Sequence, residues 1–236
     1  MKPVKINGFT IVETMLFLAI SALLIMGILV GTGSSINVQR YRDSVTSFQS
    51  YLQKQYSNVA NVSNDSDLNT CNGVANNHTG QSECVILGKY ITVDNNSNKT
   101  VNVKNIIGII PPANQSVPDN DLDAIKAYGP TVSDVGAESF VIDWESSAVK
   151  TDGSPTALSM IILRSPSSGI IRTFISSNNS TIEPISTILD ASSLSQPAKI
   201  CLDSNGLFTG KRMAVQIDGN STGASGVEIL GDNSGC

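Results

Sequence analysis

The sequence lacks the residues on which most enzyme active sites depend. It contains one histidine, His78, in an asparagine-rich stretch, so neither a histidine-based triad nor a histidine metal cluster can be assembled. A Gly-Lys-Ser/Thr phosphate loop, paired glycines opening a helix and a nucleophile elbow are also missing. We therefore expect a protein that is not an enzyme and that uses no metal or cofactor.

Charged and aromatic side chains are scarce as well. Only 15% of the residues are charged and 5% are aromatic, and the net charge at pH 7 is −5. A nucleic-acid-binding domain usually presents a basic face, and no such face is visible in the sequence. We expect no nucleic-acid partner. The many Ser, Asn, Thr and Gly residues indicate a polar, weakly charged surface of the kind found in exported β-rich proteins.

One long apolar segment lies near the N-terminus. Residues 9–30 contain a single charge, Glu13, and a helix of this length spans about 33 Å, close to the roughly 30 Å of a bilayer's hydrocarbon core. The residues ahead of it include Lys2 and Lys5 and no acid, so the positive-inside tendency keeps that end in the cytoplasm. We expect residues 9–30 to cross the membrane once and everything after Val30 to be exported.

Glu13 is the anomaly of this segment. A carboxylate inside a membrane helix costs about 2.5 to 3.5 kcal/mol at the bilayer centre and less near an end. Glu13 is tolerated either because it lies near the cytoplasmic headgroups or because it waits for a partner charge. Its side chain is too short to reach far toward the headgroups, and ionised groups inside membranes are usually functional. We favour the partner charge.

The junction around Gly8 resembles that of the type IV pilin-like proteins, which include pilins, minor pilins and type II secretion pseudopilins. In that family a short basic leader ends in Gly, an aromatic residue follows, and Glu stands at the fifth position, as Gly8, Phe9 and Glu13 do here. The resemblance implies that a membrane-embedded prepilin peptidase cuts between Gly8 and Phe9 and methylates the new amine of Phe9. It also implies that Glu13 pairs with the Phe9 amine of a neighbouring subunit during filament assembly.

Other kinds of N-terminal segment fit this sequence less well. A secretory signal peptide has an apolar region of about 7 to 15 residues, and the run here is longer and contains an acid, although residues 31–35 form a weak cleavage site. A lipoprotein needs a cysteine directly after the run, and the first cysteine is Cys71. An uncleaved membrane anchor is the remaining alternative. We favour the prepilin leader, residues 1–8.

The four cysteines all lie on the expected exported side. An even number in that compartment indicates two disulfides, and we favour Cys71 with Cys84 and Cys201 with Cys236 among the three pairings that four cysteines allow. The second pair resembles the C-terminal disulfide of many pilins. A zinc site is the competing interpretation, but the spacings are not C-x-x-C.

Helical periodicity resumes after a glycine-containing stretch. Gly31 and Gly33 each weaken a helix by about 1 kcal/mol relative to Ala, so we expect a kink or a local melt there. Residues 31–60 then form an amphipathic helix, which we expect to pack on the sheet of its own domain, with a coiled-coil partner as the alternative. Its apolar stripe consists of Val38, Tyr41, Val45, Phe48, Leu52, Tyr56 and Val59.

Residues 61–236 have the pattern of a β-rich domain. We expect a loop over 61–80 and then six to eight antiparallel strands separated by turn residues, so the fold class is α+β with a long N-terminal helix packed on an antiparallel sheet. The segments with a strand pattern, from which these six to eight strands are expected, lie at 84–93, 100–110, 140–144, 157–164, 169–175, 199–202, 207–208, 212–217 and 226–230. The strand order near the C-terminus loosely resembles that of the H-type minor pseudopilins.

Asp119, Asp121 and Asp123 alternate like the start of a calcium loop. The glycine and the distant glutamate of that loop are missing. We therefore expect these acids to cap the short helix that follows and to complement its dipole, with calcium binding as the alternative.

These patterns together predict a minor type IV pilin or pseudopilin, a structural subunit of a pilus or secretion pseudopilus. The expected location is the membrane, with a short cytoplasmic N-terminus and a domain at the cell surface or in the periplasm. The expected partners are the prepilin peptidase, other pilin subunits and the membrane. The alternative is a surface adhesin or binding module that uses a pilin-like anchor.

Overall fold

The structure, a computed structural model, describes residues 10–61, 84–112, 114, 116–190, 196–206, 210–231 and 234–236, and the backbone of 70–71 and 74–75. It divides the chain into two compact units, Met1–Arg40 and Tyr41–Cys236. The expected strand at 207–208 and most of the expected loop over 61–80 lie outside the described residues. Each unit is described by itself below.

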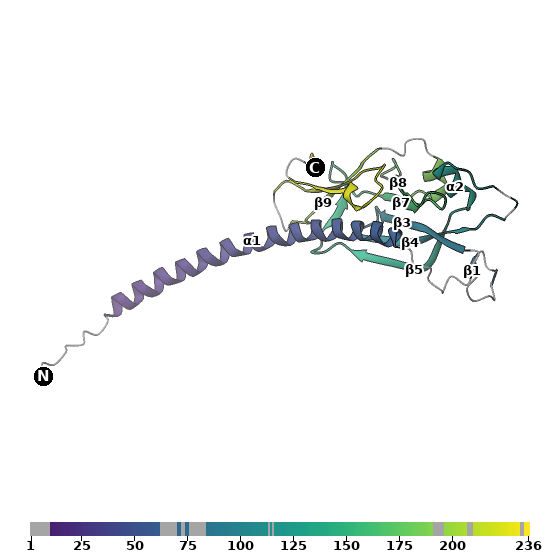
Figure 1. Ribbon diagram of the computed structural model, residues 1–236. Helices are drawn as coiled ribbons and strands as arrows, with labels where there is room; N and C mark the ends of the chain where they lie inside the picture. The colour runs from purple at the N-terminus through teal and green to yellow at the C-terminus, as the bar shows by residue number, and fades with distance from the viewer. Residues whose placement is uncertain are drawn as a thin grey trace. The chain divides into compact units, whose positions relative to one another are not determined.

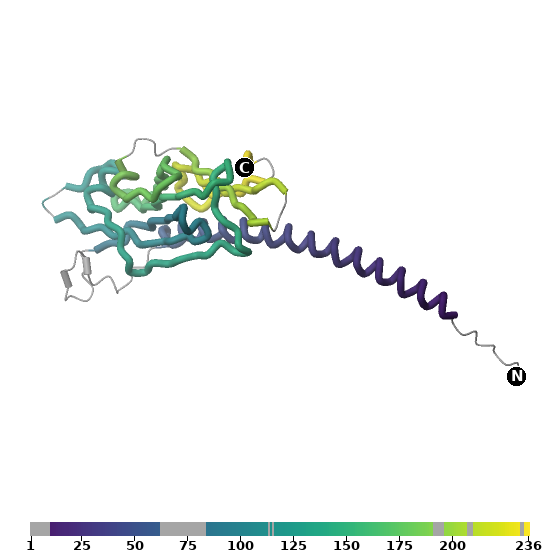
Figure 2. The backbone as a smooth tube through the Cα atoms, turned by 180° about the vertical axis from the view of Figure 1, so that it is seen from behind, coloured from purple at the N-terminus to yellow at the C-terminus, as the bar shows by residue number. Residues whose placement is uncertain are grey.

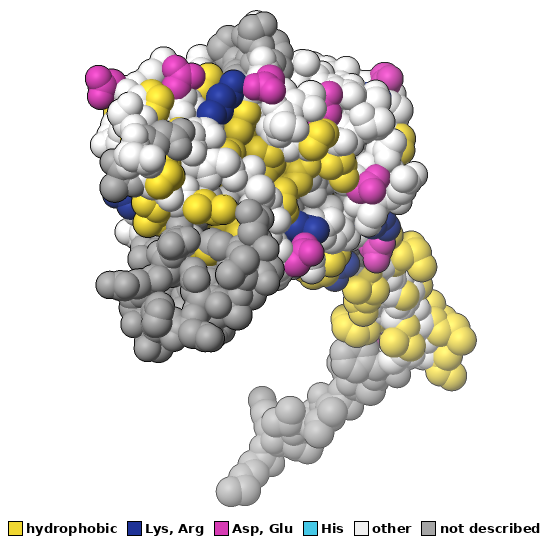
Figure 3. Space-filling view, turned by 90° about the vertical axis from the view of Figure 1, so that its right-hand side faces the viewer, with side chains coloured by type: hydrophobic (Ala, Val, Ile, Leu, Met, Phe, Trp, Pro, Cys, Tyr) yellow, Lys and Arg dark blue, Asp and Glu magenta, His cyan; other side chains and the backbone are white. Residues whose placement is uncertain are grey.

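Helix α1 (Ile11–Ala60) supplies all of the described first unit and continues into the second. It is long and apolar enough to cross a membrane, by length and composition, and its most apolar window is not buried against any part of the described protein. The exposed hydrophobic side chains of this segment are visible beside the grey terminal residues in Figure 3.

The glycine-containing stretch after Val30 is helical throughout, so the expectation of a local melt there is wrong. The Thr32 hydroxyl donates to the carbonyl oxygens of Ile28 (3.0 Å) and Leu29 (3.1 Å) and remains compatible with the helix. Good helix formers on both sides of the stretch account for this, because propagating a helix adds one hydrogen bond per residue, whereas restarting one requires a new nucleus.

The second unit contains two main antiparallel sheets (Figure 1). The first has the order β5-β4-β3-β7-β8 and the second the order β11-β10-β9-β6. The strands of the first are β3 (Cys84–Asp94), β4 (Ser97–Ile109), β5 (Thr131–Val141), β7 (Leu158–Arg164) and β8 (Ile171–Ile175). The strands of the second are β6 (Ser147–Val149), β9 (Ala198–Asp203), β10 (Ala214–Ile217) and β11 (Val227–Leu230).

Shorter elements complete this unit. They are the two-stranded pair β1 (Thr70–Cys71) and β2 (Val74–Ala75), the helices α2 (Asp121–Ala127) and α3 (Ile185–Asp190), and the 3₁₀ turn η1 (Ala224–Gly226). The pair β1-β2 lies where we expected only loop. The expected fold class is therefore confirmed as α+β, but with the strands divided between two sheets.

The core sits on both faces of the five-stranded sheet. Side chains alternate along each strand, so Ile91 and Val93 of β3 face α1 while Tyr90 faces the opposite way. Residues 41–60 of α1 share one hydrophobic cluster with both sheets, and α2 and α3 share a second cluster with the other face of the five-stranded sheet. Figure 2 shows this part of the helix running beside the strands.

One expected strand is misplaced. We expected a strand at 140–144, whereas β5 begins at Thr131 and ends at Val141, and Trp144 lies in a turn closed by a Ser146 N–H to Asp143 O bond of 3.2 Å. Trp144 (φ 55°) and Glu145 (φ 58°) both adopt the left-handed conformation, which a strand cannot contain. The apolar side chains of 140–144 therefore led us to extend the predicted strand three residues beyond the actual end of β5.

Candidate functional site

The start of α1 carries the residues singled out by the prepilin motif. Gly8 and Phe9 lie outside the described residues. Thr10 is the N-cap of the helix, because its carbonyl accepts the first helical bond from Thr14 N–H (3.1 Å) and its hydroxyl oxygen accepts from Glu13 N–H (3.3 Å). Thr10 and Glu13 have the spacing of a capping box, T-x-x-E, a signal that our reading of the sequence missed.

Glu13 lies in the first turn of α1, and its side chain is exposed. An acid at this position is favoured by the partial positive charge of the helix N-terminus. The Thr10 bond is made by the Glu13 backbone amide, so the carboxylate itself is not consumed by capping. Glu13 can therefore stabilise its own helix end and still accept an external positive charge.

The helix surface that follows Glu13 is apolar and exposed. Ile11 is 77% exposed and Phe17 69% exposed, and no residue of α1 before Tyr41 is buried. Water would make such a surface unfavourable at about 25 cal/mol per Å². A bilayer or the apolar surface of another protein would remove that cost. The other large apolar side chains exposed by at least half here are Val12, Met15, Leu16, Leu18, Ile20, Leu23, Leu24, Ile25, Met26, Ile28, Leu29 and Val30.

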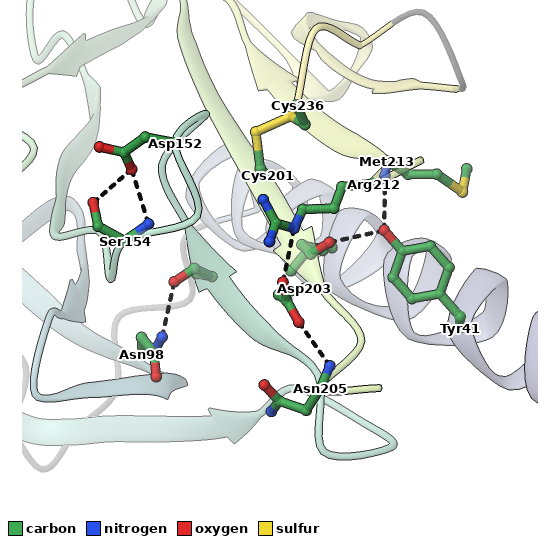
Figure 4. A network of polar contacts seen from close by, with 12 residues as sticks. Tyr41, Asn98, Asp152, Ser154, Cys201, Asp203, Asn205, Arg212, Met213 and Cys236 are labelled. Carbon is green, nitrogen blue, oxygen red and sulfur yellow. Dashed lines mark hydrogen bonds and ion pairs between the residues drawn. A yellow bond between two sulfur atoms is a disulfide. The ribbon is translucent and has the colours of Figure 1, made fainter. Parts of the chain in front are cut away.

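Tyr41 anchors α1 to the four-stranded sheet at the point where the second unit begins (Figure 4). Strands β9 and β10 pair through Cys201 and Ala214 and separate beyond them. Leu202 N–H still donates to Met213 O (3.0 Å), but the reciprocal bond is replaced by the Tyr41 hydroxyl, which donates to Leu202 O (2.8 Å) and accepts from Met213 N–H (2.7 Å). One side chain of the helix thus completes the ladder of the sheet.

Charged groups surround this anchor. Asp203 accepts from Arg212 Nε (2.7 Å) and, through its other oxygen, from Asn205 N–H (2.8 Å) (Figure 4). The end of β9 is thus bonded both to the residues that follow it and to the segment that leads into β10. Burial raises the pKa of Tyr41 above its usual range, despite the bond from Met213 N–H and the charge of Arg212. The Tyr41 hydroxyl therefore stays neutral and serves as donor and acceptor at once.

The C-terminal residue is fixed beside the same network. Cys201 and Cys236 form a disulfide with their Cα atoms 5.8 Å apart, which confirms this pairing. Ser234 strengthens the attachment, since its hydroxyl donates to Arg212 O (2.7 Å) and its carbonyl accepts from Lys199 Nζ (2.8 Å). The disulfide and these two bonds tie the chain end to β9 and to the segment before β10.

The other expected disulfide is only partly visible. Cys84 begins β3, is 6% exposed and takes part in a disulfide. The side chain of Cys71 lies outside the described residues, so its pairing with Cys84 remains a prediction. The described residues contain no free cysteine and no group of three or more metal-binding side chains that could hold an ion.

The aspartates before α2 have a structural role in the described protein. Asn120 is the N-cap, accepting from Leu122 N–H (2.9 Å), and Asp121 and Asp123 lie in the first turn. Asp121 also accepts bonds from Ser168 Oγ (2.6 Å) and Arg172 (2.8 Å), which lower its pKa to about 2. The cap is thus an amide rather than one of the expected acids, and the Asp121 carboxylate is already occupied by the β7-β8 hairpin.

The chain matches no protein-family model, no curated protein and no solved structure. Its function is therefore inferred from its own residues. Two features concern function most directly, namely the capped, acid-bearing start of the apolar helix and the firm attachment of the same helix to the sheets.

Proposed function

We propose that this protein is a minor type IV pilin or pseudopilin, a membrane-anchored structural subunit of a pilus or secretion pseudopilus. A prepilin peptidase removes residues 1–8 after Gly8 and methylates the amine of Phe9. The mature subunit then waits in the membrane, with its C-terminal domain exported to the cell surface or the periplasm, until it is assembled.

The observation that carries the proposal is the position of one acid on an otherwise uncharged apolar helix. Glu13 is the sole charge among residues 9–39 and lies in the first helical turn, at the fifth position after the proposed cut. A carboxylate in that environment is stabilised when a positive charge comes within hydrogen-bonding distance. The Phe9 amine of a neighbouring copy is such a charge, and it would approach the correct end of the helix.

The two halves of α1 suit the two stages of this mechanism. The first half is apolar enough to be stored in the bilayer and later to pack against equivalent helices in a filament. The second half is held in its domain by buried side chains and by the Tyr41 bonds, so that a pull on the helix moves the domain with it. The family resemblance implies that an ATPase-driven platform supplies that pull.

Replacing Glu13 by Ala or Gln tests the proposal. Export and leader cleavage should be intact, because the cut site and the span are unchanged, while incorporation into filaments sheared from cells should be lost. Thr10→Ala is the matched control, because it removes the helix cap, at about 1 kcal/mol, and keeps the charge. Incorporation of Glu13→Ala at the wild-type level, or an equal loss in Thr10→Ala, would contradict the assembly role of the carboxylate.

Mass spectrometry of the mature N-terminus tests processing separately. The expected first residue is Phe9 carrying one added methyl group. A mature chain that retains residues 1–8, or one cut on the outer side of the bilayer, would contradict the prepilin assignment. Co-purification with filaments distinguishes this proposal from an adhesin that only uses a similar anchor.

A further inference from the structure

Three of the four outer edges of the two main sheets are covered by side chains or turns. At β11, Val227 O, which points away from β10, accepts from Gln49 Nε2 (2.9 Å) and Gln53 Nε2 (3.2 Å) of α1. At β6, Val149 forms a bridge with Pro155, and at β8 the residues Thr173, Phe174 and Ile175 are buried by the chain packed around them. These contacts occupy edges that would otherwise pair with another chain.

Strand β5 is the exception. It pairs with β4 on one side, and no other described strand pairs with it. Nine of its eleven residues are exposed. In Figures 1 and 2 its outer side carries no described helix or strand along the half that ends at Val141.

The register shows which peptide groups of β5 face outward. Ile142 N–H donates to Lys99 O (2.8 Å), and in an antiparallel pair the bonded positions alternate. Phe140 therefore directs its N–H and C=O toward β4, whereas Ser139 and Val141 direct theirs away from the sheet. Their four backbone groups have no hydrogen-bond partner among the described residues and have the spacing that an added antiparallel strand requires.

The surroundings of these groups are apolar and acidic. Val141 is 61% exposed and Trp144, in the turn that follows, is 47% exposed. Residues 131–145 contain no Lys or Arg and four acids, of which two are bonded to lysines of β4, as Lys104–Asp134 (2.7 Å) and Lys99–Glu145. The charge of Glu138 also acts on Lys89 of β3. The four acids therefore outnumber these three lysines by one, and this excess favours a positively charged partner with apolar side chains.

A second copy of the chain fits this edge poorly when the whole of β5 is paired with itself. In the antiparallel register that pairs all eleven residues of β5 with the same strand of another copy, position i faces position 272 − i. Asp134 then lies opposite Glu138 twice in the pair, and like charges in that position are destabilising. Asp143 adds a further acid just beyond the end of the strand.

We propose that residues 137–141 of β5 form a docking site for an extended, basic segment of a different protein, which adds to the five-stranded sheet as an edge strand. Backbone hydrogen bonds to Ser139 and Val141 would hold the segment. Apolar contact with Val141 and Trp144 and attraction between its Lys or Arg side chains and the acidic rim would select it. The site is independent of the filament function proposed above.

A binding experiment on the full chain in detergent micelles tests this site. The probe is a fluorescein-labelled nine-residue peptide in which valine alternates with threonine and lysine, and its counterpart carries glutamate in place of lysine. Fluorescence anisotropy should show the lysine peptide binding at least tenfold more tightly than the glutamate peptide. Addition of the lysine peptide should slow amide hydrogen exchange at Ser139 and Val141.

Ser139→Pro should lower the affinity for the lysine peptide at least tenfold, because it removes an outward N–H that β4 does not use. Ser139→Ala keeps that N–H and should bind like the wild type. If a thermal melt shows that the proline variant is not folded, Val141→Lys provides the second test, with the same tenfold loss expected from repulsion. Equal binding of both peptides, an undiminished affinity in the folded variants, or a β5-dependent dimer of the full chain would overturn the proposal.

Discussion

The two halves of α1 form one uninterrupted helix, yet they are built for different surroundings. All eight buried residues of the helix lie at or after Tyr41, and the residues from Ile11 to Val30 are exposed apart from the half-buried Ser21. Both halves are rich in large hydrophobic side chains. The difference is that residues 41–60 confine theirs to one face, which also buries Ser44 and Gln55, and place most of their other polar side chains elsewhere, while the first half is apolar on all sides.

This difference shows how one element can serve as anchor and as core. A helix that is hydrophobic all round needs an apolar environment on every side, whereas an amphipathic one needs it on one side. The second half also makes hydrogen bonds to the sheets through Tyr41, Gln49, Gln53 and Tyr56, and residues 11–30 make no comparable bond among the described residues. Stability of the domain should therefore depend on the second half alone.

The largest expected effect is a core truncation in the second half of the helix. Leu52 is fully buried, and Leu52→Ala should lower the free energy of unfolding of the domain by about 2 to 5 kcal/mol because it leaves a cavity. Leu24, 63% exposed, is the matched position in the first half, and Leu24→Ala should leave that free energy unchanged. Denaturant unfolding followed by Trp144 fluorescence measures both. An equal loss in the two variants would contradict the division of the helix.

The C-terminal disulfide should have the next largest effect. Cys201 and Cys236 are 35 residues apart, and the chain-entropy model assigns closure of such a loop about 4 kcal/mol. The double replacement by serine should lower the free energy of unfolding by about 2 to 4 kcal/mol and speed amide exchange in β9 and β10. Intact exchange protection in these strands would show that the Ser234 bonds suffice to hold the chain end.

A smaller effect on stability is expected from removing a tyrosine hydroxyl, and it should differ between Tyr41 and Tyr51 in the second half of the helix. Tyr41→Phe removes both hydroxyl bonds and leaves Leu202 O and Met213 N–H unpaired, at about 1 to 3 kcal/mol. The hydroxyl of Tyr51 is buried without a hydrogen-bond partner among the described residues, so Tyr51→Phe should leave the stability unchanged or raise it. Thermal melts of the two variants provide the comparison, and equal destabilisation would show that ring packing, rather than the hydroxyl, accounts for the effect of Tyr41→Phe.

The sequence predicted the parts of this arrangement that depend on local pattern. Helical spacing of Tyr41, Phe48 and Leu52 correctly indicated a buried stripe, because the period of an α-helix fixes which residues share a face. The hydroxyl bonds of Tyr41 reach residues 161 and 172 positions away, and no local pattern encodes such contacts.

Of the two candidate sites, one follows from local sequence spacing and the other depends on the tertiary fold. The Thr10 cap could have been recognised from the T-x-x-E spacing, since the bond is made within one helical turn. The open edge of β5 could not, because strand order decides which strand lies outermost. The glycine at position 136 and the acids around it also concealed the first half of that strand.

The smallest expected effect is a pH dependence that originates at Tyr51. Its ring stacks on Phe140 with the ring centroids 4.3 Å apart, and burial together with the charge of Glu138 raises the pKa of Tyr51 to about 12. An unfolded tyrosine has a pKa of about 10, so the folded state resists ionisation; this contribution to stability is complete below pH 10 and is lost as the pH rises toward 12. The alkaline loss of stability should be smaller in Tyr51→Phe. Absorbance at about 295 nm should show one tyrosine fewer ionising in the upper part of that range. In Glu138→Gln the same tyrosine should ionise at a lower pH, because one of the two causes of its raised pKa is gone, and an unchanged titration there would assign the whole shift to burial.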